Sequence, residues 1–288
     1  MPTSESLCIA CGSAALEPFV STRHLALHRC EDCAGLTALP RPTQQTLTTY
    51  HDTDTYFNHP YFEHRRSAIE RTEERCRDVL RRVTLAYPLF APAGRRHLDV
   101  GCDTGIFVET FSRCHGTLPV GIDVTERAVR LARARGIEAH QCDLGHLNSQ
   151  APFSLITLID VIEHVADPVQ LLRDVKARLQ PGGVCYVETP NIRSTIYGVG
   201  RVVSKLTGGR PAWLCERLFL PEHVQYLSAA GLIRAASAAD LRVVAMTRRS
   251  LHSADINASM PLRAGVEVLQ WLDCLLGREI LHCAVLVA

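Results

Sequence analysis

The sequence predicts an α/β protein built on a doubly wound parallel sheet of seven strands, with a small metal-binding module in front of it. Short apolar runs at 97–100, 119–124, 137–142, 153–159 and 184–187 alternate with helical patterns, and such alternation is typical of parallel sheets. Two pairs of cysteines near the start of the chain predict the module. A length of 288 residues suits one main domain with an appendage.

Composition excludes several classes of protein. The chain has 31 basic and 30 acidic residues, 47% hydrophobic residues and a net charge of +1, which are ordinary globular values. They argue against a disordered chain and against a polybasic nucleic-acid coat. No basic start precedes an apolar stretch, and no run approaches the ~18 apolar residues of a membrane span. We therefore expect a cytoplasmic protein; its oligomeric state stays open, with a homodimer as one option.

The cysteine pairs have the spacing of a tetrahedral zinc site. Cys8 and Cys11 form one C-x2-C pair, and Cys30 and Cys33 form the other after eighteen intervening residues. Each pair can hold one edge of the ion while the loop between them closes the tetrahedron. Four thiolates leave no open coordination position, so we expect a structural Zn²⁺ in a zinc-ribbon-like module over residues 1–45. The alternative is four unlinked cysteines.

Residues 46–90 are expected to join this module to the sheet. Three tyrosines and two phenylalanines fall within residues 50–62, and a charged helical pattern with apolar residues on one side follows over 63–86. Two interpretations remain open for the aromatic stretch. It is a linker whose rings cover the core, or a lid that closes over a bound ligand.

The domain over 91–288 follows in order. Thr125 is expected to cap a helix that ends before Gly136, and Asp167 with Pro168 starts a helix that stops at 181–183. A glycine-rich insertion at 191–212 belongs to a segment, 191–227, expected to shape an acceptor pocket. The tail predicts a helix over 228–239, a strand over 241–246, a helix over 261–276 and a strand over 280–287.

Acidic residues and glycines gather where the first strands end. The first strand runs into Asp99, Gly101, Cys102 and Gly105, and the glycines allow a ligand to approach the backbone. The turn lacks the third glycine of a dinucleotide site, and Asp99 would repel phosphate, so a cationic or neutral ligand is favoured. Asp123 ends the second strand and is followed by Val124; Asp143 with Leu144 follows the third. Ligands of such sheets bind at these strand ends.

In these motifs, over residues 95–245, the sequence resembles the class I S-adenosylmethionine-dependent methyltransferases, which have a Rossmann-like fold. The resemblance implies that Gly101 and Gly105 hold the methionine portion of the cofactor, Asp123 its ribose, and Asp143 with Leu144 its adenine. The other residues expected at the cofactor are Asp99, Cys102, Val124 and Asp160. Asp103 departs from the family, which usually has a glycine there.

The fourth strand ends in Asp160-Val161-Ile162-Glu163-His164. This D-x-x-E-H stretch resembles a motif of ubiquinone-pathway O-methyltransferases and of small-RNA 2′-O-methyltransferases, where it binds a divalent cation. His223, in a P-E-H stretch, would complete a second cation site with Asp160, Glu163 and His164. The favoured interpretation is metal-free: His164 or His223 acts as general base, with Glu163 as a third catalytic residue.

The resemblance implies methylation of a small-molecule acceptor of natural-product, quinone or sugar type, most simply at oxygen. Deoxysugar C-methyltransferases also carry a four-cysteine module, but only Glu222 and His223 match their Tyr-His-Glu-His motif. Two alternatives stay open. One is an RNA methyltransferase that grips RNA with the zinc ribbon, which the near-zero net charge disfavours; the other is a catalytically inactive module that binds S-adenosylmethionine.

Overall fold

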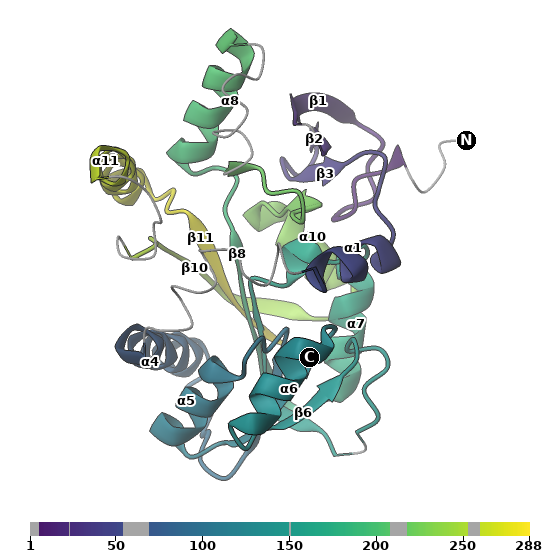
Figure 1. The fold of residues 1–288 in the computed structure, drawn as a ribbon, viewed down its shortest axis with the longest axis vertical. Helices are drawn as coiled ribbons and strands as arrows, with labels where there is room; N and C mark the ends of the chain where they lie inside the picture. Colours follow the sequence, from purple (N-terminus) through teal and green to yellow (C-terminus); the bar gives the residue numbers. More distant parts are fainter. Residues whose placement is uncertain (1–5, 23, 54–68, 150, 208–217, 253–259) are drawn as a thin grey trace.

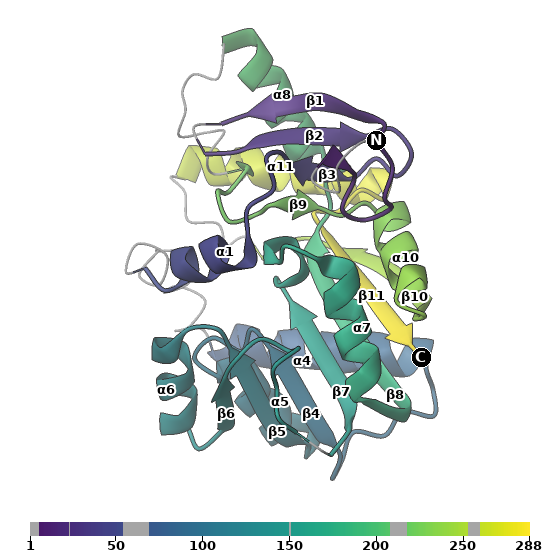
Figure 2. The ribbon, with the colours of Figure 1, turned by 90° about the vertical axis from the view of Figure 1, so that its right-hand side faces the viewer.

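A computed structural model describes residues 6–22, 24–53, 69–149, 151–207, 218–252 and 260–288. Most of the aromatic stretch at 50–62 and the start of the expected helix at 63–86 lie outside these ranges. The described part forms two sheets that stand one above the other in Figure 2. No helix in these ranges has the length and apolar character needed to cross a membrane.

The larger sheet is the predicted one, with seven strands in the order β10-β11-β8-β7-β4-β5-β6. Neighbours from β8 to β6 run parallel, whereas β11 is antiparallel to both β8 and β10. The strands are β4 Arg96–Val100, β5 Leu118–Asp123, β6 Glu138–Gln141, β7 Phe153–Ile159, β8 Leu179–Pro190, β10 Arg242–Arg249 and β11 Leu281–Val287. The carboxyl ends of β4, β5, β6 and β7 therefore meet at one edge.

Helices cover both faces of this sheet. Figure 2 shows α7 in front of the strands and α4 behind them. The helices are α4 Ile69–Ala86, α5 Ile106–His115, α6 Glu126–Ala134, α7 Pro168–Arg178 and α10 Ala229–Ala238. Buried side chains of α4 and α5 form one apolar cluster with β8 and β11, and those of α7 and α10 belong to another. Burial of these faces is the main force that holds the layers together.

Two expectations about helix ends differ from the structure. Strand β8 begins at Leu179, directly after α7, because Leu179 pairs with Phe153 of β7. Long-range pairing thus overrides the local Pro-Gly-Gly signal. Thr125 stands at the start of α6 without capping it through its side chain; its hydroxyl donates to Asp123 instead. Asp167 caps α7 as expected, accepting from the backbone of Gln170.

The smaller sheet belongs only in part to the cysteine segment. Strands β1 Leu16–Ser21, β2 Ala26–Cys30 and β3 Leu36–Ala38 form an antiparallel array, and β9 Gln225–Tyr226 adds a fourth strand beside β3. The hydroxyl of Ser228 donates to the carbonyl of Cys33. The cysteine segment is thereby joined to the chain that follows the glycine-rich insertion.

Three further α-helices and one short 3-10 helix, Ile162–His164, complete the described part. The helix α1 Gln44–His51 follows the cysteine segment, α8 Thr195–Thr207 lies within the insertion, and α11 Met260–Leu276 lies between β10 and β11. Figure 1 shows α8 beside the small sheet and α11 on the side of α8 away from that sheet, both far from α5 and α6. The side chains of Ser194 and Thr195 donate to Asp273, which fixes the start of α8 against α11.

Candidate active site

A cavity of about 240 Å³ opens at the edge where β4, β5, β6 and β7 end. Its walls include eight of the nine residues expected at the cofactor: Asp99, Gly101, Cys102, Asp123, Val124, Asp143, Leu144 and Asp160. The ninth, Gly105, lies at the start of α5, where a Cβ would come within 3.0 Å of Ala132 on α6. The position of Gly105 thus fits close helix packing better than direct contact with a ligand.

The turn after β4 has an unusual backbone. Gly101 has φ +67°, and a Cβ there would lie 2.7 Å from Cγ2 of Val161. Asp103 has φ +48°, a left-handed conformation that aspartate tolerates better than most residues. Its backbone N–H donates to Oδ2 of Asp123 at 3.0 Å. An aspartate at this point is therefore compatible with the tight turn.

The cavity is acidic. Its lining residues include five aspartates and a single arginine, Arg75. Burial raises the pKa of Asp99 to about 7, while a 2.6 Å hydrogen bond from the Thr157 hydroxyl favours its charged form. Asp123 accepts from the backbone N–H and the hydroxyl of Thr125, both at 2.9 Å. This lining suits a cationic ligand with hydroxyl groups.

Asp160 belongs to a buried ion-pair network. Arg75 of α4 donates to Asp160 at 3.3 Å and also to Glu188 of β8. Arg249 donates to the same Glu188 at 2.6 Å. Burial alone would raise the pKa of Glu188, but the two guanidinium groups outweigh it and hold the pKa below its usual value. Arg75 is thereby fixed in the wall of the cavity.

A second group of titratable side chains lies beside the cavity. One ligand atom from each of Glu163, His164 and His223 falls within 4.8 Å of the others. His164 lines the cavity, as does His51 of α1, whereas His223 does not. The centres of the His164 and His223 rings lie 4.6 Å apart. The structure thus brings the two candidate bases together and gives only His164 access to the cavity.

The protonation state of His164 follows from its surroundings. Its Nδ1 lies 3.2 Å from the carbonyl oxygen of Glu222, which can only accept, so Nδ1 carries the proton and Nε2 the lone pair. Burial, with neighbouring His223 and His51, lowers the pKa of His164 well below its usual value. The ring is therefore neutral near pH 7.

Glu163 and His223 lie next to His164 but do not line the cavity. Burial raises the pKa of Glu163 well above its usual value, and burial lowers that of His223 to about 4. Among the described residues, Glu163 Oε1 and His223 Nδ1 lack a hydrogen-bond partner. Together with His164, these two groups form a donor set of one carboxyl group and two imidazoles that a divalent cation can use. Asp160 stands outside this group because it pairs with Arg75.

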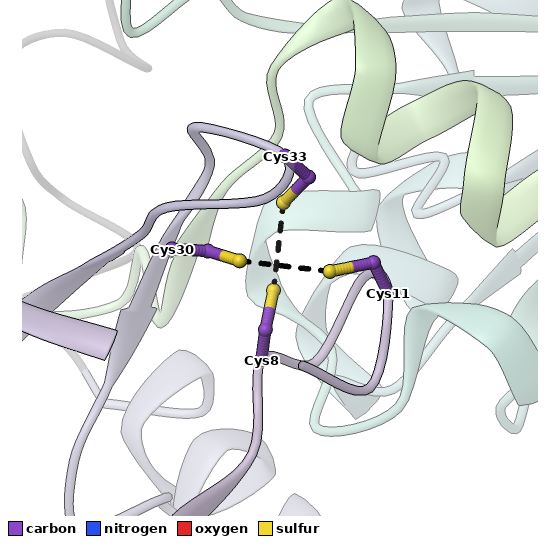
Figure 3. A group of neighbouring side chains, drawn as sticks. All are labelled: Cys8, Cys11, Cys30 and Cys33. Carbon is purple, nitrogen blue, oxygen red and sulfur yellow. Dashed lines mark hydrogen bonds between the residues drawn. The ribbon is translucent and has the colours of Figure 1, made fainter. Parts of the chain in front are cut away.

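The four cysteines of the module converge, as Figure 3 shows. The Sγ atoms of Cys8 and Cys33 lie 3.6 Å apart, and so do those of Cys11 and Cys30. Zinc–sulfur bonds of about 2.3 Å in a tetrahedron place sulfurs about 3.8 Å apart. The observed separations are close to this value, so the cluster is compatible with zinc.

Several lining residues carry no local sequence signal. His51, Gln44, Thr72 and Arg75 come from α1 and α4, which precede the first strand of the large sheet. Nothing in the pattern of these helices distinguishes the residues that face the cavity from those that face solvent. Only the packing of α1 and α4 across the strand ends selects them.

A family model described as a methyltransferase domain matches residues 62–246, more than half of the chain. The chain belongs to this methyltransferase domain family. Membership confirms the predicted fold class and shows that the domain is that of a methyltransferase. The cysteine module lies outside the matched residues.

Individual relatives are more distant. Identity is 33% over 108 residues with the ubiquinone biosynthesis O-methyltransferase of Albidiferax ferrireducens, covering 34% of this chain and 42% of that protein. It is 27% over 183 residues with the enzyme of the same name from Aeromonas salmonicida, covering 61% and 74%. The match thus spans less than half the length of the Albidiferax ferrireducens enzyme.

A solved structure shares the fold. The magnesium protoporphyrin IX methyltransferase of Synechocystis, determined with bound SAH, superposes with a TM-score of 0.53 at 14% identity. The match covers 84% of this chain and 99% of that one. At this identity the likeness concerns the fold alone.

Proposed function

We propose that this methyltransferase transfers a methyl group from S-adenosylmethionine to an oxygen atom of a small-molecule acceptor, with His164 as the general base. The observation that carries the proposal is that a neutral, buried histidine shares one cavity with the acidic strand ends. The relatives named as O-methyltransferases support oxygen as the acceptor atom. They favour a quinone-type phenol over the natural-product and sugar acceptors that the sequence also allows.

The charge of the cavity suits the cofactor. S-adenosylmethionine supplies a methyl group on a positively charged sulfur, and five aspartates line the cavity. We assign Asp123 to the ribose hydroxyls, because its carboxylate oxygens retain lone pairs beside the bonds from Asp103 and Thr125. Asp143 and Leu144 would meet the adenine, and the backbone at Gly101 would hold the methionine portion.

His164 would remove the proton of the acceptor hydroxyl. Its Nε2 bears the lone pair, since Nδ1–H donates to the carbonyl of Glu222. Alignment of acceptor and methyl group provides most of the acceleration in such a displacement, and a positioned base typically adds about 10²–10⁴-fold. His223 and Glu163 do not line the cavity, so we assign them a supporting role around the His164 ring.

The acceptor would enter beside α4. A neighbouring cavity of about 370 Å³ lies between α4 and the end of β10, and Arg75 and Asp160 line both cavities. Its walls combine Leu251 and Leu281 with charged side chains. This mixture suits a ring that carries polar substituents. We therefore expect the acceptor to extend from this cavity, past Arg75 and Asp160, into the first cavity, where His164 lines the wall. No described residue of the insertion 191–227 lines either cavity.

A divalent cation at Glu163, His164 and His223 is a second arrangement, favoured by the orphaned Glu163 Oε1 and His223 Nδ1. A cation held there would act as a Lewis acid toward an acceptor hydroxyl. We favour metal-free use because Asp160, the first residue of the motif, is committed to Arg75. Transfer that needs added Mg²⁺ or Mn²⁺ would reverse this choice.

The Asp123→Ala variant is the direct test of the cofactor assignment. Loss of charge-assisted hydrogen bonds to two ribose hydroxyls is expected to weaken S-adenosylmethionine binding by about 10- to 100-fold. Calorimetric titration measures the change, and Glu138→Ala, an exposed residue of β6, serves as control. Equal affinity in Asp123→Ala and wild type would refute the role of Asp123.

Cofactor binding is also expected to depend on pH. The pKa of Asp99 is raised to about 7, so this carboxyl is neutral below that pH and charged above it. A cationic ligand prefers the charged form, and affinity should therefore rise by up to about tenfold from about pH 6 to about pH 8. Asp99→Asn should remove this component of the titration. If the affinity of Asp99→Asn changes with pH in the same way as that of the wild type, the assignment is contradicted.

A further inference from the structure

A second cleft lies far from the proposed cofactor residues in the fold. It has a volume of about 540 Å³ and lies between the cysteine module and α8. Strands β1 and β2 contribute Phe19 and Arg29, and the chain from Ile192 to Val203 forms the opposite wall. Arg278, just before β11, closes one side. None of the cofactor residues proposed above lines this cleft.

The cleft is strongly basic. Its described lining includes four arginines, Arg29, Arg193, Arg201 and Arg278, and no acidic residue. None of the four forms an ion pair within the described part of the chain. Glu17 lies opposite Arg29 in the strand register, but it does not line the cleft. In contrast, Arg75 and Arg249 in the cavity of the proposed acceptor are paired with the carboxylates of Glu188 and Asp160. The four arginines therefore carry a positive charge that no described acidic side chain pairs with in an ion pair.

Buried polar residues hold two of these arginines in place. Asn191, 1% exposed, accepts from the backbone N–H of Arg193 at 3.0 Å and donates to the carbonyl of Arg278 at 3.3 Å. Asp273, also 1% exposed, binds the start of α8, and its carbonyl accepts from the backbone of Arg278 at 2.8 Å. The loops that carry Arg193 and Arg278 are thus tied to one another.

Arg201 is positioned from the other side. Its guanidinium carbon lies 4.3 Å from the centre of the Phe19 ring on β1. Stacking of this kind orients a guanidinium and leaves its edge free to donate hydrogen bonds. Arg201 on α8 and Arg29 on β2 therefore face a space that the cysteine module helps to enclose. The cleft exists only where the module and the insertion meet.

We propose that this cleft binds a small molecule through a phosphate or diphosphate group. Guanidinium groups match phosphate oxygens with two parallel hydrogen bonds, and a set of four without counterions favours a compact polyanion. A long nucleic acid fits less well, because its binding requires a basic face that follows the backbone. The net charge of the chain is only +1, and the arginines gather in one hollow.

Calorimetric titration of the full chain with pyrophosphate tests the proposal. Binding is expected in the wild type, and the double variant Arg193→Gln with Arg278→Gln should raise the dissociation constant by about tenfold or more. Both side chains are exposed, so the fold should survive; an unchanged thermal midpoint and unchanged S-adenosylmethionine affinity verify this. That second readout also separates failure here from failure of the proposed cofactor site.

Arg242→Gln is the matched control, because Arg242 is an exposed arginine at the start of β10 and does not line the cleft. It should leave pyrophosphate affinity unchanged. Three results would overturn the proposal: no heat with pyrophosphate at millimolar concentration, equal weakening by Arg242→Gln, or tighter binding of a single-stranded RNA oligonucleotide than of pyrophosphate. The last result would identify the cleft as part of an RNA surface.

Discussion

Replacement of His164 by alanine is expected to lower kcat for methyl transfer by roughly 10²–10⁴-fold and to leave the affinity for S-adenosylmethionine nearly unchanged. His164 is the one member of the Glu163–His164–His223 group that lines the cavity. Its lowered pKa keeps the ring in the unprotonated form throughout the neutral range. Transfer of a labelled methyl group to a catechol such as 3,4-dihydroxybenzoate, with calorimetry of the cofactor, measures both quantities.

His223→Ala provides the comparison for His164. His223 lies 4.6 Å from the His164 ring but outside the cavity. Its removal should lower turnover by loosening the His164 ring, with a smaller effect than His164→Ala and little change in cofactor affinity. A larger loss in His223→Ala would assign the base to His223 instead. Full activity in both variants would eliminate histidine as the base.

Replacement of Cys33 by serine is expected to remove bound zinc and to destabilise the chain by several kcal/mol. Cys33 is 2% exposed and contributes one of the four converging thiols. Its carbonyl accepts from Ser228, and β3, a few residues further on, pairs with β9. Loss of the metal should therefore disturb the segment around His223 and lower methyl transfer as well. Metal analysis and thermal unfolding measure the first two effects.

Cys274→Ser is the matched control for the zinc experiment. Cys274 is an exposed cysteine of α11, away from the four-cysteine cluster. Its replacement should change neither zinc content nor the thermal midpoint. Zinc retained at wild-type stoichiometry in Cys33→Ser would show that the cluster does not hold the ion as proposed. Zinc lost with no change in the thermal midpoint would show that the ion does not stabilise the fold.

Local patterns in the sequence predicted much of the large sheet. The run that became β7 is short and almost continuously apolar, because this central parallel strand is buried on both faces. The C-x2-C spacing likewise predicted which four of the twelve cysteines converge. Such features depend on neighbours a few residues away. A reader of the sequence can therefore recognise them without knowing the fold.

The role of the P-E-H segment could not be predicted in this way. Its short strand β9 exists because β3 offers free backbone groups to Gln225 and Tyr226, and two residues are too few to show an alternating pattern. The helix α8 was similarly hidden by the glycines of the insertion. Both elements are selected by partners far away in the chain.

The sequence alone determined three features of this protein: the order of the strand ends, the bend at Gly101, and the acidic side chains at those strand ends. Tertiary structure decided that His164 lines the cavity while His223 does not, that Asp160 pairs with Arg75 of α4, and that four arginines meet between the module and α8. The physical reason is distance along the chain. Propensity and periodicity act over a few residues, whereas charge pairing and burial depend on which distant segments pack together.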